Sequence, residues 1–364
     1  MSDYWSSLAS NLSPYVPGEQ PKDRQFIKLN TNENPYPPSP KVIEAIKQAA
    51  SGQLRLYPDP GGSELREAVA ARYNIKPEQV FAGNGSDEIL AFAFGAFFSG
   101  GLNAEPILFP DISYSFYPVY SDLWDIPRRL VPLKDDFSID VSEYTVPCGG
   151  VIFPNPNAPT GMALPLSDIL PLAEYLEKQK KVLILDEAYT AFNAVHDSAY
   201  CSISAIPHIN EHPNLLTIHT LSKSACLAGL RVGFAVGNEQ LIEGLCCVRD
   251  SFNSYTLDRL AQAGAAAAIA DTEYYDEINN RVMATRARTA RALMDIGFTV
   301  LPSAANFLFI SPPDRSGAKL FAILREKGIL VRHFKQPRIV DFLRVSIGTD
   351  DEMDSFLKVC REKI

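Results

Sequence analysis

The sequence is organised around one stretch, Thr220-Leu221-Ser222-Lys223-Ser224-Ala225-Cys226-Leu227-Ala228-Gly229-Leu230-Arg231-Val232-Gly233. Apolar, β-branched runs at 215–218 and 232–236 flank it, and each is typical of a buried strand. Lys223 is therefore expected in a turn between two buried elements. Such a lysine is either a solvated loop residue, as most lysines are, or a shielded amine whose lowered pKa lets it form a Schiff base.

The neighbours of Lys223 favour the second interpretation. Thr220 and Ser222 supply hydroxyl groups and Arg231 supplies a fork of donors, which together suit a phosphate dianion close to the amine. An aldehyde that carries a phosphate is pyridoxal phosphate. This cofactor needs a lysine for its imine and an acid opposite its pyridine nitrogen.

A candidate for the acid lies upstream, where the apolar run 181–185 ends in Asp186, Glu187 and, two residues on, Tyr189. In an open α/β sheet, ligands bind outside the carboxyl ends of the strands, so Asp186 would point into the site. The alternative is that Asp186 only caps the next helix.

Three segments together resemble the signature segments of the pyridoxal-phosphate-dependent aminotransferases of fold type I. They are 220–233, 186–189 and 155–161, the last reading Asn-Pro-Asn-Ala-Pro-Thr-Gly. With 29–35 and 57–59, the likeness narrows to the histidinol-phosphate aminotransferase family and covers the chain from about residue 10 onward. The resemblance implies an α/β fold, with a large domain of mostly parallel sheet flanked by helices and a smaller α+β domain.

The pattern along the chain predicts the same organisation. Residues 1–38 are rich in proline and polar groups and are expected to form an arm that packs with the small domain and the active site, the alternative being a mobile terminus. Alternating strands and helices from about 80 to 237 predict a mostly parallel sheet. We expect the large, cofactor-binding domain over 39–280 and the small domain over 281–364. Within these, the arginines of a long helix near 272–296 are expected to form a solvated face, and residues 349–352 to form a helix capping box.

The resemblance also implies roles for individual residues. Lys223, Asp186 and Tyr189 would be catalytic. The cofactor would be bound by Gly85, Ser86, Asp87, Tyr114, Asn157, Asp186, Tyr189, Thr220, Ser222, Lys223, Arg231 and Tyr57. The substrate would be bound by Tyr15, Asn30, Arg332 and Arg344.

Physical reasons accompany several of these assignments. A glycine turn before a helix, as at Gly85, leaves free backbone N–H groups that bind phosphate. Tyr114 follows a buried strand and can stack on the pyridine ring, while Asn157 and Tyr189 can donate to the ring oxygen. By composition Tyr57 is simply a loop tyrosine; the resemblance makes it reach the cofactor phosphate of the other subunit, which implies a homodimer.

Arg344 lies inside an apolar strand, where an unpaired charge is costly. It therefore needs an anionic partner. That partner is either an internal carboxylate or, as the resemblance implies, the anion of the substrate, with Arg332 assisting.

Composition excludes several other classes of protein. The 364 residues carry 34 basic and 43 acidic side chains, a net charge of −9, without a basic run that would bind nucleic acid. No signal peptide and no apolar run of bilayer length is recognisable, so we expect a cytoplasmic protein without a membrane partner. The cysteines at 148, 201, 226, 246, 247 and 360 lack metal-ligand spacing and are expected to be reduced thiols, with no metal site.

The expected activity is transamination of L-histidinol phosphate with 2-oxoglutarate in histidine biosynthesis, with Lys223 as both tether and proton carrier. The residues 30–35 and 251–255 favour this substrate within the family. The alternatives are an aromatic aminotransferase and the threonine-phosphate decarboxylase of the same family. A more distant alternative is a non-catalytic, cofactor-binding regulator.

Overall fold

A seven-stranded sheet forms the centre of the computed structural model, which describes residues 4–21, 25–193 and 204–362. Its strand order is β2-β8-β7-β6-β5-β3-β4. The strands are β2 (Val80–Gly83), β3 (Ile107–Pro110), β4 (Arg128–Val131), β5 (Gly150–Pro154), β6 (Leu183–Asp186), β7 (Leu215–Thr220) and β8 (Gly233–Gly237). Only β8 runs against its neighbours, β2 and β7. The mostly parallel sheet predicted from the sequence is therefore confirmed.

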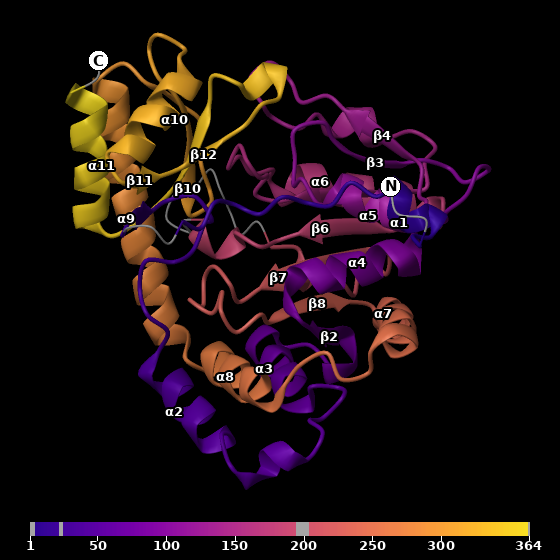
Figure 1. The fold of residues 1–364 in the computed structure, drawn as a ribbon. Coiled ribbons are helices and arrows are strands. Elements are labelled where there is room, and N and C mark those ends of the chain that lie inside the picture. The colour runs from indigo at the N-terminus through magenta and orange to yellow at the C-terminus, as the bar shows by residue number, and fades with distance from the viewer. Residues whose placement is uncertain (1–3, 22–24, 194–203, 363–364) are drawn as a thin grey trace.

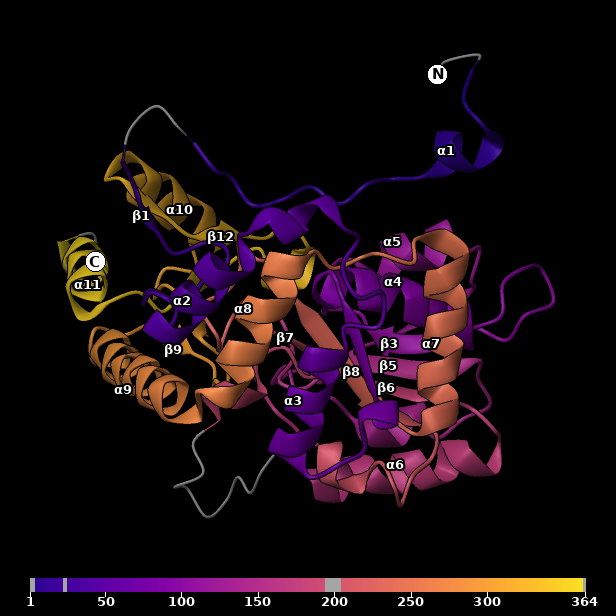
Figure 2. The same cartoon turned by 90° about the horizontal axis from the view of Figure 1, so that it is seen from below.

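Both faces of this sheet are buried along β2, β3, β5, β6, β7 and β8, which explains why these strands read as continuous apolar runs, whereas the edge strand β4 is mostly exposed. Side chains alternate between the faces, so that Ile152 and Ile184 pack toward α4 (Gly85–Phe97), α5 (Tyr117–Leu123) and α7 (Glu239–Phe252). Phe153 and Leu185 pack toward α6 (Leu166–Lys178) on the other face. Figure 2 shows α4 and α5 on one side of the strands and α6 on the other. Beside β2 and β8, a further apolar cluster joins α2 (Pro40–Ala49), α3 (Ser63–Tyr73) and α8 (Arg259–Ala270).

The C-terminal part of the chain forms a second, antiparallel sheet in the order β12-β13-β10-β9 (Figure 1). The strands are β9 (Thr299–Val300), β10 (Phe307–Ser311), β12 (Arg332–His333) and β13 (Leu343–Ser346). Helices α9 (Thr272–Asp295), α10 (Gly317–Glu326) and α11 (Asp350–Glu362) share one apolar core with it. The change from a parallel to an antiparallel α+β pattern therefore occurs where the sequence pattern changes.

Helix α9 connects the two parts of the molecule (Figure 1). It is continuous over 24 residues, and the domain boundary that we predict at 280/281 falls within it. The division into domains stays a prediction.

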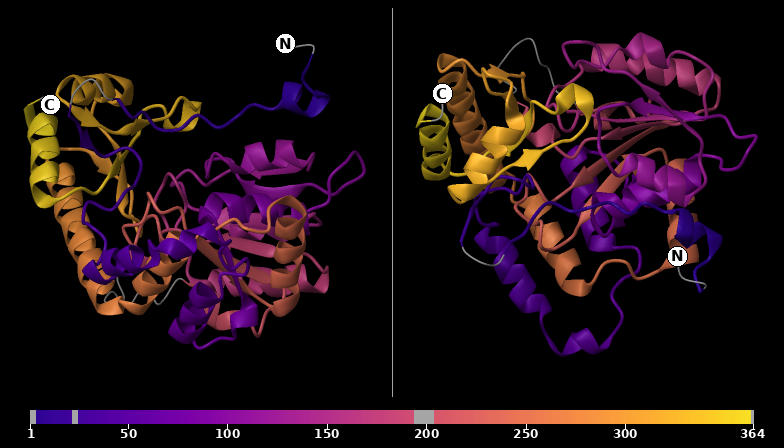
Figure 3. Two further views of the ribbon diagram at one scale, coloured as in Figure 1. Left: turned by 60° about the horizontal axis from the view of Figure 1, so that its bottom comes forward. Right: turned by 45° about the horizontal axis from the view of Figure 1, so that its top comes forward.

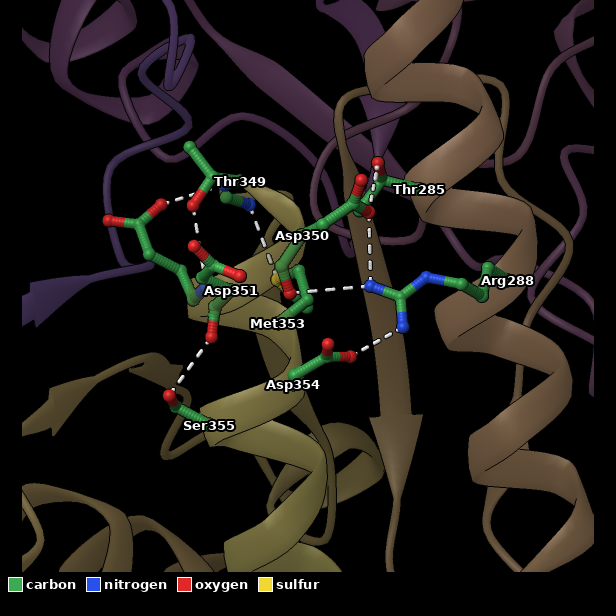
Figure 4. Close-up of polar contacts among 10 residues, drawn as sticks. Thr285, Arg288, Thr349, Asp350, Asp351, Met353, Asp354 and Ser355 are labelled. Atoms are coloured by element: carbon green, nitrogen blue, oxygen red, sulfur yellow. Dashed lines mark hydrogen bonds and ion pairs between the residues drawn. The ribbon is translucent and has the colours of Figure 1, made fainter.

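One of the arginines of α9 corrects our expectation of a solvated face. Nη1 of Arg286 donates to the carbonyl oxygens of Phe192 at 2.9 Å and Ala305 at 2.5 Å, and burial lowers its pKa to about 10. Arg288, by contrast, is exposed and pairs with Asp350 and Asp354 at the start of α11 (Figure 4). The apolar period of a helix does not show which of its polar residues a neighbouring loop will cover.

The N-terminal residues run from α1 (Ser7–Asn11), beside the large sheet, toward the small sheet (Figure 3). There β1 (Ile27–Lys28) pairs in parallel with β11 (Ile329–Leu330). The side chain of Asn30 donates to the carbonyl of Glu19 at 2.8 Å, and Glu19 pairs with Arg325 of α10. The segment 27–30 is thus held against the C-terminal part of the chain.

The described residues contain free cysteines, no group of side chains that could hold a metal ion and no helix that could span a membrane. Cys148, Cys226, Cys246, Cys247 and Cys360 are free, and Cys201 lies outside the described residues. Within the described ranges there is no group of three histidine, cysteine, aspartate or glutamate side chains that could hold a metal ion. In the same ranges no helix has the length and apolarity to cross a membrane.

Candidate active site

A cavity of about 270 Å³ lies at the carboxyl ends of β6 and β7, between the two sheets. Residues from the arm, the start of α4, the turn after β7 and the strands β12 and β13 line it. The sequence-predicted residues that line it are Tyr15, Asn30, Ser86, Asp87, Tyr114, Asp186, Tyr189, Thr220, Ser222, Lys223, Arg231, Arg332 and Arg344. Gly85, Asn157 and Tyr57 are the predicted residues that do not.

Lys223 projects into this cavity from the turn after β7. The turn is fixed because the Leu221 N–H donates to the Val232 carbonyl at 3.0 Å and the Ser222 N–H to the Thr220 hydroxyl at 3.1 Å. The amine Nζ donates to the Thr31 carbonyl at 3.0 Å. Burial, and next the positive charge of Arg344, lower the pKa of Lys223 from 10.5 to about 8. A substantial fraction of the amine is therefore neutral near pH 8, as proton transfer requires.

Arg231, Ser222 and the start of α4 form a cluster of donors on one side of the cavity. Nη1 of Arg231 donates to the Ser222 hydroxyl and Nη2 to the Asp87 carboxylate, each at 3.2 Å. Gly85 has a φ of +80°, and a Cβ there would lie 2.6 Å from Nη2 of Arg231. The guanidinium can pack over the first turn of α4 only because that position is glycine. Free N–H groups of a helix start, hydroxyls and a guanidinium suit a phosphate.

Asp186 ends β6, is buried and lines the cavity. It accepts from the backbone N–H of Ala188 and from the hydroxyl of Tyr117, each at 3.2 Å. Burial raises its pKa from 3.8 to about 6. The alternative, that Asp186 only caps the next helix, is wrong, because the next helical turn, Thr190–Phe192, has Tyr189 at its N-cap and the Asp186 side chain lines the cavity.

Two tyrosines are anchored around Asp186. Tyr189 accepts from the side-chain amide of Asn32 at 2.9 Å, and Tyr114 donates to the Asp87 carboxylate at 2.6 Å. Burial is the main cause that raises the pKa of both phenols. Both therefore stay protonated at neutral pH and can donate a hydrogen bond.

Arg344 and Arg332 face the cavity from the small sheet, where they are directly opposed in the β12–β13 pair. Nη2 of Arg344 donates to the Asn30 carbonyl at 3.1 Å, and its Nε has no partner. Among the described residues, no carboxylate pairs with either arginine. An internal carboxylate thus does not balance Arg344, and the two guanidinium groups are available to an anion in the cavity.

The remaining predicted residues lie behind or outside the cavity. Asn157 is buried, and its amide group donates to the Ile112 carbonyl and the Thr160 hydroxyl, so donation to a cofactor requires it to release one partner. Its Oδ1 has no partner. Tyr57 is 77 % exposed and stacks on Tyr255 with ring centroids 4.6 Å apart. Its predicted contact with a second subunit stays a prediction.

The sequence did not indicate several residues that form hydrogen bonds to the predicted site residues. Tyr117 is buried and donates to Asp186. Asn32 positions Tyr189, and Thr31 accepts from Lys223. Both lie in the 29–35 segment that carries the resemblance, so the segment was a usable signal although we selected only Asn30 from it.

Comparison with known proteins identifies the class to which this fold and site belong. The family model described as aminotransferase class I and II matches residues 24–359. The chain therefore belongs to the class I and II aminotransferases.

Its relatives narrow this class to the histidinol-phosphate aminotransferases. The chain is 52 % identical over 366 residues to histidinol-phosphate aminotransferase of Aromatoleum aromaticum, covering 100 % of this chain and 99 % of the relative. It is 51 % identical to that of Clostridium acetobutylicum, covering 100 % of both. The crystal structure of histidinol-phosphate aminotransferase from Sinorhizobium meliloti, in complex with pyridoxal-5'-phosphate, matches with a TM-score of 0.86 at 25 % identity, covering 100 % of this chain and 99 % of that one.

Proposed function

We propose that this protein transfers the amino group of L-histidinol phosphate to 2-oxoglutarate, in histidine biosynthesis, with pyridoxal phosphate as cofactor. One observation carries the proposal: a lysine of lowered pKa, a buried aspartate and two arginines without carboxylate partners face one cavity among the described residues. The names of the relatives support the choice of substrate.

The residues present fit pyridoxal phosphate. The donor cluster of Arg231, Ser222 and the start of α4 suits its phosphate, and Asp186 suits its pyridine nitrogen. The unpartnered Oδ1 of Asn157 marks a buried polar group beside this site that still lacks a contact. When bound, the cofactor supplies the carbonyl group that takes up nitrogen and a ring that withdraws electrons.

The side chains of the chain have separate tasks in this scheme. Asp186 would keep the pyridine nitrogen of the cofactor protonated. The positive charge on that nitrogen would in turn favour the ionised form of the Asp186 carboxylate. Nζ of Lys223 takes the proton from the substrate carbon that bears the amine and would deliver it to the carbonyl-derived carbon of the cofactor, because its lowered pKa leaves it neutral often enough to act as a base. Tyr189, oriented by Asn32, would donate a hydrogen bond from its hydroxyl to the ring oxygen of the cofactor.

Arg332 and Arg344 bind the phosphate of L-histidinol phosphate in the first half of the reaction and a carboxylate of the oxo acid in the second. Tyr15, which stacks on Phe116 at 4.3 Å and lines the cavity, covers this end. Bidentate binding by arginine suits both anions.

We further infer a homodimer in which Tyr57 reaches the cofactor phosphate of the other subunit. The exposure of Tyr57 and its position outside the cavity of its own chain support this arrangement. The cytoplasm remains the predicted compartment.

Steady-state formation of L-glutamate tests the proposal. Purified protein with pyridoxal phosphate and 2-oxoglutarate is expected to turn over L-histidinol phosphate with a kcat/KM at least about tenfold above that for L-phenylalanine. A higher kcat/KM for L-phenylalanine would show that the enzyme is an aromatic aminotransferase. Release of carbon dioxide from L-threonine phosphate would show that it is the decarboxylase.

A further inference from the structure

Three carboxylates line the cavity among the described residues, and the proposed function uses two of them. Asp186 faces the cofactor ring. Asp87 pairs with Arg231 and accepts from Tyr114. The third, Glu33, has no task in the scheme above.

Glu33 is held in a fixed position at the cavity. Its Oε1 accepts from the amine of Lys28 at 2.7 Å and its Oε2 from the hydroxyl of Thr31 at 3.0 Å. Its side chain is 39 % exposed. Because an ionised carboxylate has about four lone-pair positions, these two contacts leave it able to accept a further hydrogen bond from a group inside the cavity.

The residues before Glu33 lie beside the groups that handle the rest of the substrate. The Asn30 carbonyl accepts from Arg344, at the anion end, and the Thr31 carbonyl accepts from Nζ of Lys223, at the reacting amine. Thr31 also contacts Glu33 through its hydroxyl. Along this segment the chain therefore passes the phosphate position and the amine position before it presents a carboxylate.

L-Histidinol phosphate has a matching arrangement of groups. One carbon carries its amine, the arm that ends in phosphate and the arm that ends in imidazole. The imidazole ring carries an N–H donor in its neutral and its protonated form. With the first two groups bound by Lys223 and the arginines, the third needs an acceptor on the same side of the cavity.

We propose that the Glu33 carboxylate accepts the hydrogen bond of the imidazole N–H and so selects L-histidinol phosphate over substrates with a phenyl ring. This inference rests on the proposed function. A phenyl ring has no hydrogen-bond donor. It would displace water that donates to the carboxylate and would leave that carboxylate oxygen without a hydrogen bond. Sites that bind a polar group in this way discriminate strongly against analogues that lack it.

The test compares kcat/KM for L-histidinol phosphate with that for L-phenylalaninol phosphate, which keeps the amine and the phosphate and replaces imidazole by phenyl. In Glu33→Gln, which keeps an oxygen acceptor and loses the charge, the ratio of the two values is expected to fall about tenfold. In Glu33→Ala, which has no acceptor, it is expected to fall about 100-fold.

A matched control separates this role from a purely structural one. Lys28→Met removes the ion pair with Glu33 but leaves the carboxylate, so the ratio is expected to stay within about threefold of the wild-type value. An unchanged ratio in both Glu33 variants, or an equal loss of kcat/KM for both substrates, would overturn the inference. Failure of the proposed function would be seen separately, as wild-type protein that does not turn over L-histidinol phosphate.

Discussion

At the scale of single residues, the site places ionisable groups where their charged forms are unfavourable. Lys223 and Asp186 show it most clearly, because burial lowers the pKa of the amine and raises that of the carboxyl. Shifts of this kind are typical of catalytic groups. They also carry a cost in stability, which can be measured in the protein without cofactor.

Lys223→Met is expected to stabilise the cofactor-free protein at pH 7 while abolishing transamination. With a folded pKa of about 8 against 10.5, the folded state binds fewer protons than the unfolded state between these values, so stability rises with pH in that window. Well below pH 8 the full penalty of roughly 3 kcal/mol applies, and methionine removes it. Urea unfolding at pH 7 and pH 10 measures it, with exposed Lys47→Met as control. A destabilised Lys223→Met at pH 7 would contradict this reading.

A second buried pair lies behind the cavity, on the neighbours of Asp186 and Thr220. Oε2 of Glu187 lies 3.3 Å from Nε2 of His219. Burial raises the pKa of Glu187 to about 8 and lowers that of His219 to about 3. Both groups are therefore mostly neutral at pH 7, and their contact is not an ion pair.

Glu187→Gln should remove a pH dependence of stability. Since the folded pKa of Glu187 lies above its ordinary value of 4.5, the stability that it contributes is lost as the pH rises through 8. Between pH 6.5 and 8, where His219 is neutral in the folded state, wild-type protein should lose stability relative to the variant. Thermal melts across this range measure the difference, and parallel curves would show that Glu187 is ionised throughout.

Residue roles were predictable where chemistry restricts the choice and not where contacts across the chain decide. Lys223, Asp186 and Arg231 stand in patterns that few other functions need, and the fold brings them to one cavity. The contacts of Tyr117 with Asp186 and of Asn32 with Tyr189 join distant segments. No local pattern in the sequence could indicate them.

At the scale of elements, the last helix, α11, is held by a local capping motif and by a surface ion pair, which we expect to contribute different amounts to its stability. Thr349 and Glu352 form the predicted capping box: the Thr349 N–H donates to the Glu352 carboxylate at 2.8 Å and the Glu352 N–H to the Thr349 hydroxyl at 3.3 Å. Arg288 of α9 bridges to Asp350 and Asp354 across the helix interface (Figure 4). The box satisfies helix N–H groups that otherwise lack partners.

Thr349→Ala is therefore expected to cost more stability than Arg288→Ala. Loss of a threonine cap costs about 1 kcal/mol, whereas exposed ion pairs contribute about 0.2 to 1 kcal/mol and are screened by salt. Urea unfolding at low and high salt separates the two, because only the effect of Arg288→Ala should shrink with salt. The opposite order of the two effects would mean that the Arg288 bridge, and not the cap, fixes α11.

Most elements follow from their apolar periods, but their ends depend on contacts. Helix α2, which Ser39 caps, ends at Ala49, and the chain turns into a short 3₁₀ helix from Gly52. The β7 strand extends to Thr220, beyond the run 215–218, because its last residues pair with β8. Cross-strand pairing, which the sequence does not show locally, sets both its length and the position of Lys223.

At the scale of the whole molecule, the order of strands places β6 and β7 side by side at the centre of the sheet, so that the segments after them meet. The small sheet then supplies Arg332 and Arg344 from the other side. The sequence pattern predicted both sheets, but the register that opposes the two arginines depends on how β12 and β13 pair.

The proposed homodimer predicts that two inactive variants restore each other. Lys223→Ala and Tyr57→Ala each lose activity alone, but a mixed dimer has one site with both native residues. After exchange of equal amounts, activity should recover to about a quarter of the wild-type value, since about half of the dimers are mixed and each has one intact site. Absence of recovery, with exchange verified by mass spectrometry, would place Tyr57 in its own subunit's site or away from catalysis.

The central claim is that Lys223, within this cavity, moves the proton that turns L-histidinol phosphate into its oxo product. The most direct measurement mixes cofactor-loaded protein with L-histidinol phosphate without an oxo acid and counts the oxo product formed. We expect about one equivalent per subunit for wild-type protein within seconds, and less than about 1 % of that rate for Lys223→Ala with cofactor still bound. Equal rates in the two proteins, or no product from the wild type, would contradict it.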